Sequence, residues 1–421
     1  MEKHETFFRI HHLPPYHLGD IAKAVIDARV SGRDIIDLSQ FNPSLSPPAV
    51  AVDKLVQASL QPHNHRYSAS QGITKLRESI ARWYERRDGV ALDVEREIVV
   101  TMGTKEALSH LLFAVVSQGD TVLLPTPSYP IHNAGIVLAG GNVIGVPLFD
   151  PAQEVPPTTL TEADDDFFQR LQVAYEGTWP RPIMMLLSFP HNPTTIVVTK
   201  GFLTRLVEFA LERGIYLIHD FAYADLCFDG YQAPSLLSIP GAKDIALECY
   251  SVSKGLSMPG WRVGFCVGNE RLIGALKKIK SYLDCGIFQP LQIATVRVLD
   301  SHERLVADHV ETYRARRNIL ADGLSSLGFS LQRPKGTVFV WAKIPKRYRH
   351  KGSLAFVREV LERTQVAVCP GVGFDAHTDQ YVRFALTEGE ARLRAALNQL
   401  TAMFDEPSAH DATIQSLEAA G

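Results

Sequence analysis

The sequence has little cysteine and no excess of positive charge, and each shortage excludes a class of protein. Its 421 residues include five cysteines, which are scattered and never spaced as C-x-x-C. An odd, scattered set suits a reduced cytoplasm better than a disulfide framework. The 43 lysines and arginines are balanced by 46 aspartates and glutamates, for a net charge of −3. Nothing therefore favours binding to nucleic acid or to an anionic membrane surface.

Long apolar runs and clustered metal ligands are also missing. No apolar run approaches the length of a transmembrane helix. The start, MEKHETFFRIHH, lacks the basic region and apolar core of a secretory signal. The histidine pairs His11/His12 and His63/His65 have no neighbouring set of cysteines or carboxylates that would hold zinc. We therefore expect a cytoplasmic protein without a metal site.

What is present between Arg96 and Gly268 is a regular alternation of apolar runs with helical segments such as Lys105–Ser117 and Gly201–Arg213. Most of the runs are apolar throughout, which is typical of strands covered on both faces. The alternation predicts an α/β fold with a mostly parallel sheet. The expected strands are Glu97–Thr101, Thr121–Leu124, Asn142–Pro147, Ile183–Ser188, Ile215–His219, Ile245–Ser251 and Arg262–Val267.

The later part of the chain predicts a second, smaller α+β domain. Helical spacing in Arg271–Leu283 and Pro290–Leu327 is followed by strand-like runs at Phe329–Gln332, Val338–Lys343, Val366–Cys369 and Tyr381–Leu386. We expect an N-terminal segment, 1–55, packed on this small domain, 296–404, and a large domain over 56–295. The polar tail, 405–421, is expected to be disordered.

Polar groups follow several of the predicted strands, at the edge where open α/β sheets bind ligands. Gly103 and Thr104-Lys105 open a helix whose free N–H groups would suit a phosphate, although an ordinary Thr cap explains them equally well. Asn192 precedes a proline and is held extended, so its amide could face a ligand; taken alone, the sequence favours a simple Asn-Pro turn.

Two further strand ends carry an acid and a lysine. Asp220 ends an apolar strand, where a carboxylate is costly to bury unless a cation or donor meets it; the alternative is a helix cap. Lys254 lies between an apolar strand and a Gly-rich turn, where a desolvated amine becomes a nucleophile, and Arg262 could bind a phosphate. Together these groups are the ones that pyridoxal phosphate needs.

The ordered motifs resemble class I aminotransferases of fold type I. They are SxSKxxxMPGWRxG from Ser251, and NPT from Asn192 with DxxY from Asp220 following 28 residues later. Within the family the chain is most similar to bacterial glutamate–pyruvate (alanine) aminotransferases, from the LPPY at Leu13–Tyr16 to Tyr381–Leu386. The resemblance implies a homodimer and a seven-stranded, mostly parallel sheet in the large domain.

The resemblance also implies roles around the coenzyme ring. Lys254 would hold pyridoxal 5′-phosphate as an internal imine, and Asp220 would pair with the pyridinium nitrogen. Tyr223 and Asn192 would bind the phenolic oxygen, and Tyr129 would stack on the ring.

Other residues would hold the phosphate and the substrate. The implied phosphate ligands are Gly103, Thr104, Lys105, Ser251, Ser253 and Arg262, with Tyr67 reaching the phosphate of the neighbouring subunit. Arg383 would grip the substrate α-carboxylate, and Tyr16 would contact substrate. Two departures concern the substrate site: relatives usually carry glycine at Phe41 and serine at His191.

The implied reaction is transfer of an amino group from an L-amino acid to a 2-oxo acid, with alanine and 2-oxoglutarate as the expected pair. It would pass through pyridoxamine phosphate with ping-pong kinetics, and Lys254 would move the proton. The stretch Asp284–Pro290 contains no cation, so aspartate should be a poor substrate. Phe41 leaves a preference for methionine or other neutral donors open.

Two alternatives share some of these features. A β-eliminating C–S lyase of the same fold would use the same coenzyme groups, but Arg383 favours transfer. A ligand-sensing DNA regulator is disfavoured because no helix-turn-helix fits and the net charge is −3.

Overall fold

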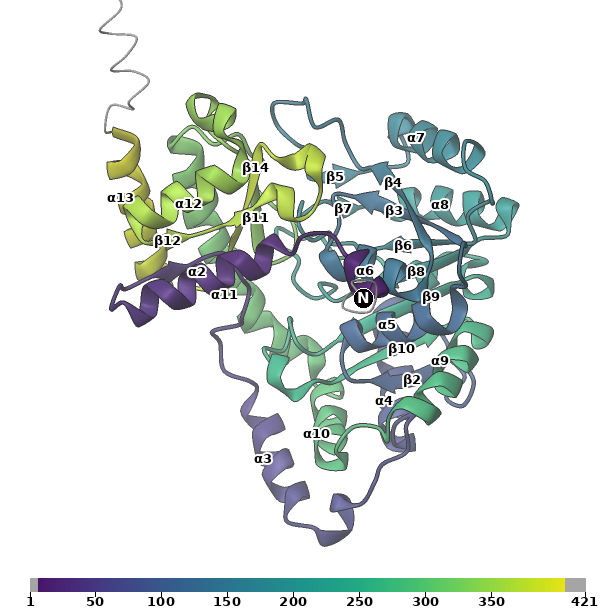
Figure 1. Cartoon of the computed structure of the whole chain (residues 1–421). Coiled ribbons are helices and arrows are strands. Elements are labelled where there is room, and N and C mark those ends of the chain that lie inside the picture. Colours follow the sequence, from purple (N-terminus) through teal and green to yellow (C-terminus); the bar gives the residue numbers. More distant parts are fainter. Residues whose placement is uncertain (1–6, 406–421) are drawn as a thin grey trace, which may run out of the picture.

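The computed structural model describes residues 7–405, and a seven-stranded sheet forms its centre (Figure 1). The strand order is β2-β10-β9-β8-β6-β3-β4; β10 is antiparallel to both of its neighbours, and the remaining pairs are parallel. This confirms the predicted fold class. The strands are β2 (Ile98–Thr101), β3 (Thr121–Thr126), β4 (Asn142–Pro147), β6 (Met184–Leu187), β8 (Tyr216–Asp220), β9 (Ala246–Ser251) and β10 (Gly264–Gly268).

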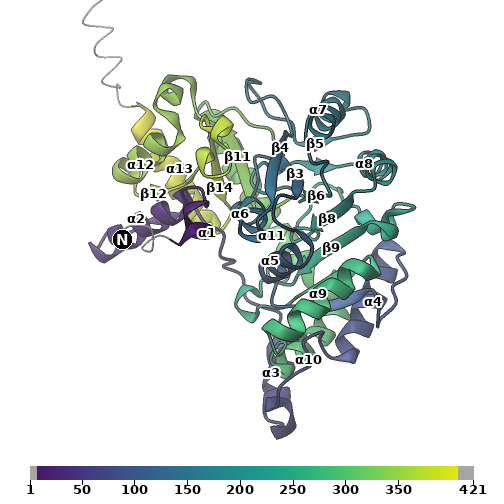
Figure 2. The same ribbon diagram turned by 45° about the vertical axis from the view of Figure 1, so that its right-hand side comes forward.

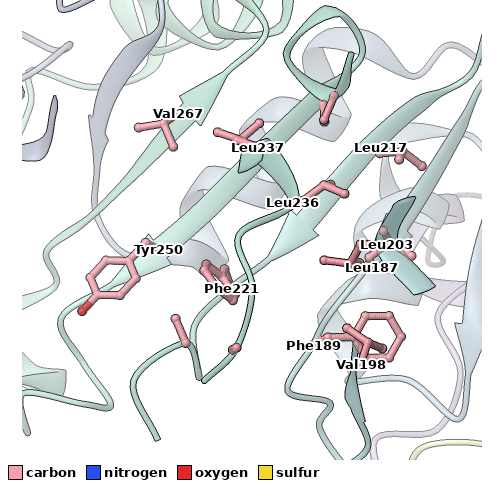
Figure 3. Packing of buried hydrophobic residues seen from close by; sticks show 14 of the residues in the cluster. Leu187, Phe189, Val198, Leu203, Leu217, Phe221, Leu236, Leu237, Tyr250 and Val267 are labelled. Atoms are coloured by element: carbon pink, nitrogen blue, oxygen red, sulfur yellow. The ribbon is translucent and has the colours of Figure 1, made fainter. Parts of the chain in front are cut away.

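Helices cover both faces of this sheet, which explains why its strands are apolar throughout. Successive side chains of a strand point to opposite faces, so Leu217 packs in one hydrophobic cluster and Ile218 in another. Figure 3 shows part of the cluster that contains Leu217. One cluster includes residues of α5 (Thr104–Val115), α6 (Pro130–Ala139) and α9 (Glu270–Leu283). The other includes residues of α4 (Thr74–Asp88), α7 (Asp165–Glu176), α8 (Lys200–Arg213) and α10 (Gln289–Leu299).

The two ends of the chain meet in a third cluster. In it, Ile21 and Ile36 pack with Phe356 and Val382, and β1 (Ile36–Asp37) pairs in parallel with β12 (Val366–Ala367). A small antiparallel sheet has the order β11-β14-β13. The elements of this part are α2 (His17–Val30), α11 (His302–Ser326), β11 (Phe339–Lys343), α12 (Gly352–Thr364), β13 (Cys369–Pro370), β14 (Tyr381–Ala385) and α13 (Glu390–Asp405). The short helix α1 (Phe8–His11) contacts α6 instead.

A helical arm extends from the body of the molecule. Its helix α3 (Ala49–Ser59) lies beside α10 in both views (Figures 1 and 2). A separate parallel pair joins the two-residue strands β5 (Thr159–Leu160) and β7 (Val197–Val198). Within residues 7–405, no helix combines the length and the apolar character needed to cross a membrane.

One local prediction was wrong. Phe329–Gln332 is not a strand, because only Ser330 forms a bridge, to Lys343, before Arg333 and Pro334 lead the chain away. The stretch Pro290–Leu327 is helical as expected, and it forms two helices, α10 and α11, separated at Asp300–Ser301. The predicted tail falls, from residue 406 on, outside the described residues, and the domain boundaries stay a prediction.

Candidate active site

A cavity of about 450 Å³ lies at the carboxyl ends of the central strands. It is the place where β6, β8 and β9 end, so the topology brings together groups that are far apart in sequence. Thirteen of the predicted site residues line it: Tyr16, Phe41, Thr104, Lys105, Tyr129, Asn192, Asp220, Tyr223, Ser251, Ser253, Lys254, Arg262 and Arg383. Gln40, Ser188 and Phe339 also line the cavity and were not foreseen.

Lys254 follows β9 and points its amine into a cationic, largely dry environment. Burial and the nearby cations of Arg383 and Arg262 lower its pKa to about 8, and Asp220 opposes them only in part. The lysine Nζ lies 5.0 Å from the centre of the Phe41 ring. A lowered pKa raises the share of neutral amine near neutral pH, which is the form that reacts.

Asp220 is the last residue of β8, and it is 7% exposed. Its Oδ2 lies 3.0 Å from Nε2 of His132, in the first turn of α6, and its Oδ1 accepts a hydrogen bond from the Ala222 amide at 3.3 Å. The alternative of a helix cap is wrong, because a turn follows rather than a helix. The carboxylate is therefore held by a histidine and faces the cavity.

Arg383 lies on β14, is 3% exposed, and joins two other parts of the site. It donates to Asn192 Oδ1 at 2.7 Å and to the Ser39 carbonyl at 3.0 Å. Its guanidinium stacks 4.1 Å from the centre of the Phe339 ring. Among the described residues its enclosed Nε has no hydrogen-bond partner, and Arg383 itself lines the cavity as a cation. Since Asn192 accepts through its oxygen, its amide hydrogens stay available.

A phosphate cradle forms where α5 begins. Gly103 is the N-cap, with φ of 83°, and no side chain caps the helix. A Cβ at Gly103 would lie 2.5 Å from Nη2 of Arg262, so the close approach requires glycine. Arg262 donates to the Met102 carbonyl at 3.0 Å, which holds the cation beside the open amides. Thr104 is the first helical residue, so the Thr-cap alternative is wrong.

Hydroxyl groups complete this cradle and the ring site. Ser251 donates to Ser253 Oγ at 2.8 Å, and both line the cavity. Burial raises the pKa of the Tyr223 and Tyr129 phenols, so both remain hydrogen-bond donors at neutral pH. Uncapped helix amides, hydroxyls and a cation suit a phosphate, and a buried carboxylate suits a protonated pyridine nitrogen. The residues present fit pyridoxal phosphate.

Tyr67 is a predicted site residue that lies outside this arrangement. It is 91% exposed and does not line the cavity. It borders a surface groove beside Cys285 and Phe288 instead. Tyr16 is also exposed, at 57%, but it does border the active-site cavity.

A trio of possible metal ligands, not foreseen from the sequence, lies elsewhere. Ligand atoms of Glu106, His110 and Asp284 lie within 4.8 Å of one another. The buried ammonium of Lys280 lies 2.9 Å from Glu106 and 2.8 Å from Asp284. Because this cation already contacts both carboxylates, the trio is explained as a buried ion cluster.

His132 contacts the candidate site and was also missed by the sequence analysis. Its carboxylate partner is 88 residues away in the sequence. The one available signal was its place three residues after Tyr129, at the start of a helix that opens with Pro130.

Comparison with known proteins adds an independent finding. A family model described as aminotransferase class I and II matches residues 33–400. The glutamate-pyruvate aminotransferase AlaC of Escherichia coli strain K12 is 44% identical over 398 residues, which cover 94% of this chain and 93% of that protein. The LL-diaminopimelate aminotransferase of Natranaerobius thermophilus is 36% identical, over 95% of this chain and 100% of its own.

Solved structures agree with these relatives. Substrate-bound BacF from Bacillus subtilis has a TM-score of 0.84 and 30% identity, covering 94% of this chain and 98% of its own. A single mutant of Thermus thermophilus aspartate aminotransferase has the same TM-score at 26% identity, with 94% and 99% of the two chains covered.

Proposed function

Because the chain belongs to the class I and II aminotransferases, which use pyridoxal 5′-phosphate, we propose that it moves an amino group from L-alanine to 2-oxoglutarate. One observation carries this proposal. Lys254, whose amine has a lowered pKa, and Arg383, a buried cation, both line one cavity, where an amino acid can be held by its carboxylate. The similarity to a glutamate-pyruvate aminotransferase supports the choice of substrates.

Each residue of the cavity takes part of the work. Arg383 binds the α-carboxylate through the guanidinium hydrogens that its bonds to Asn192 and Ser39 leave free. Lys254 moves the proton of the substrate Cα as general acid and base. Asp220, held by His132, keeps a proton on the pyridine nitrogen. The bound coenzyme supplies an electron sink and carries the amino group between the two half-reactions.

The remaining side chains position the coenzyme. Tyr223 and Asn192 line the cavity and would donate to its phenolic oxygen, and Tyr129 would pack on its ring. The phosphate ligands are the amides that begin α5 at Gly103, Thr104 and Lys105, with Ser251, Ser253 and Arg262. Since one cavity serves both substrates in turn, the kinetics are ping-pong.

The charges around the cavity limit its substrates. Its cations are Lys105, Lys254, Arg262 and Arg383, and each already has a role in the proposal. A second carboxylate on the substrate would therefore be desolvated without a partner charge. Phe41, which lies beside Lys254, also narrows the space for a side chain. Alanine is preferred and aspartate is poor for these reasons.

The deciding measurement compares kcat/KM for several donors under one condition. We expect alanine to be best and aspartate poorest, with glutamate held by polar donors or water. Methionine tests whether Phe41 selects apolar side chains, and LL-diaminopimelate tests the substrate that several relatives are named for. Aspartate equal to or better than alanine contradicts the proposal.

A separate assay distinguishes the alternative of a β C–S lyase. The protein is mixed with a cysteine derivative and no oxo acid, and pyruvate and ammonia are measured. An aminotransferase stops after one turnover, whereas a lyase continues.

We also propose that the active unit is a cytoplasmic homodimer. The exposed Tyr67 would complete the phosphate site of a second copy, an isologous arrangement. The scattered, unpaired cysteines support a reducing compartment.

A further inference from the structure

Residues 38–45, here called the strap, join the C-terminal part of the molecule to the active site. Five hydrogen bonds fix the strap on the C-terminal side. They join Leu38 to Ala367 (2.8 Å) and to Ala385 (2.8 Å), Ser39 to Arg383 (3.0 Å), Gln40 to Thr387 (2.9 Å) and Ser44 to Arg316 (2.9 Å). The strap carries Phe41 and Gln40, which both line the cavity.

The far end of the strap is fastened to the turn that presents Lys254. Ser257 Oγ donates to the Leu45 carbonyl at 2.6 Å, and Ser257 is 4% exposed. The amide of Ser257 donates to the Lys254 carbonyl at 3.3 Å, so the two residues belong to one turn. Between residues 7 and 405, this is the single hydrogen bond that joins the strap to that turn.

The backbone of Ser257 is in an unusual conformation for a serine. Its φ is 54°, in the left-handed region that residues other than glycine and asparagine rarely adopt. Such conformations persist where surrounding contacts hold them, and they gather at functional sites. Here the conformation aims a buried hydroxyl at the strap.

Phe41 is the side chain that this fastening controls. Its ring packs edge-on against Tyr313 at 5.7 Å and Phe339 at 6.1 Å, between centroids. The same ring lies 5.0 Å from Lys254 Nζ, beside the place where the substrate Cα must react. A strap released from Ser257 would let Phe41 move away from that place.

We propose that Ser257 is a positioning residue, whose hydroxyl fastens the strap to the Lys254 turn and so holds Phe41 as the wall that selects small amino-acid side chains. The proposal rests on the proposed function. It concerns the selection between substrates, and Ser257 itself touches neither substrate nor coenzyme.

The first test is kinetic and compares Ser257→Ala with Ser257→Asn. The alanine variant loses the hydroxyl, whereas asparagine tolerates the left-handed region and offers an amide donor to Leu45. In Ser257→Ala we expect KM for alanine to rise about 2- to 10-fold with kcat little changed, the range for losing one hydrogen bond. The preference for alanine over methionine should narrow by a similar factor, and Ser257→Asn should restore it.

The second test asks whether Ser257 acts through Phe41. In a Phe41→Ala background, Ser257→Ala should cause no further change in the alanine-to-methionine ratio, because coupled residues are not additive. Additive effects, or equal defects in Ser257→Ala and Ser257→Asn, would overturn the proposal. Ser238→Ala, which removes a serine–carbonyl bond in another part of the chain, should leave the ratio unchanged.

A third measurement does not depend on which substrates are used. Amide hydrogen exchange in the holoenzyme should become faster over residues 40–45 in Ser257→Ala, with β14 unaffected. If exchange speeds up but alanine is no substrate, the proposed function fails and the fastening stands. If exchange is unchanged in the strap, the fastening itself is refuted.

Discussion

The pKa of Lys254 falls to about 8 because burial and the cations of Arg383 and Arg262 disfavour its charged form. The neutral amine is the form that captures the coenzyme carbonyl, and its share rises as pH passes the pKa. We therefore predict that coenzyme uptake by the apoprotein speeds up with pH and levels off a little above 8, and not near 10.5. Stopped-flow absorbance measures this rate.

Two variants act as controls for this pH dependence. Removing a neighbouring cation in Arg383→Leu should move the midpoint to higher pH, because a like charge no longer opposes protonation. Lys254→Ala should show no lysine-bound absorbance at any pH, and it should lose transamination by at least about a hundredfold. A midpoint near 10.5 in the unmodified protein would contradict the account.

Asp220 tests the electrostatic part of the site. We predict that Asp220→Asn keeps the fold and binds coenzyme, but loses about 10²- to 10³-fold in kcat, as when one preorganised electrostatic group is removed. A neutral amide has the shape of the carboxylate but cannot hold the pyridine nitrogen protonated. Steady-state kinetics with the coenzyme content measured on the same sample checks this. Wild-type kcat would show that Asp220 only shapes its turn.

Among single residues, the sequence drew attention to Asp220 and Lys254, which end or follow strands, and missed His132 and Ser257. Asp220 ends an apolar strand and Lys254 follows another. A charged group in such a position is costly to bury, so it stands out in the sequence. His132 has an ordinary helical context, and its contact with Asp220 exists only after β8 and α6 come together. Ser257 is equally unremarkable until its φ and its bond to Leu45 are known.

The start of α5 makes a prediction about a whole element. Gly103→Ala should weaken coenzyme binding by at least about tenfold, because a Cβ collides with Arg262 and the left-handed φ is strained. The dissociation constant from coenzyme titration is the measurement. Gly214→Ala is a matched control: it has φ of 64° at the end of α8, but a Cβ there meets nothing within 4 Å. Equal losses of affinity in both variants would show that Gly103 acts through general stability and not through the phosphate cradle.

At the scale of elements, the sequence patterns predicted well which strands are buried, but predicted poorly which strands pair with one another. The central strands were recognisable because helices cover both faces and demand apolar residues throughout. Phe329–Gln332 alternates apolar and polar residues as a half-covered strand does, yet it is not a strand because a single bridge reaches a neighbour. The two-residue pairing of β1 with β12 is too short to leave any periodicity.

At the scale of the whole molecule, an apolar surface on the helical arm remains exposed in the single chain. On α3, Val52 and Val56 are 39% and 55% exposed, and Leu60, which follows the helix, is 74% exposed. Their spacing of four places them along one side of the arm. A stripe of this kind is typical of an interface between proteins, so we predict a homodimer at assay concentration, measured by sedimentation.

The exposed Tyr67 allows the predicted homodimer to be tested through coenzyme binding. Tyr67→Phe should weaken coenzyme binding several-fold without dissociating the dimer, because it removes one hydrogen bond to a phosphate. A fully active monomer would refute both the dimer and this role. The matched change Tyr282→Phe, at another exposed tyrosine, should have no effect.

The packing of the N-terminal segment against the C-terminal part of the chain has a consequence for synthesis on the ribosome. Arg33 binds the carbonyl of Leu361, which is 328 residues later in the sequence. At about 5–20 residues per second, that partner emerges roughly 15 to 65 s after the arginine does. During this interval Ile21, Val25 and Ile36 have no cluster to enter, although the central sheet can already assemble. For most of its translation, the apolar side of α2 in the nascent chain therefore has nothing to pack against. We expect a chaperone to bind the nascent chain at α2.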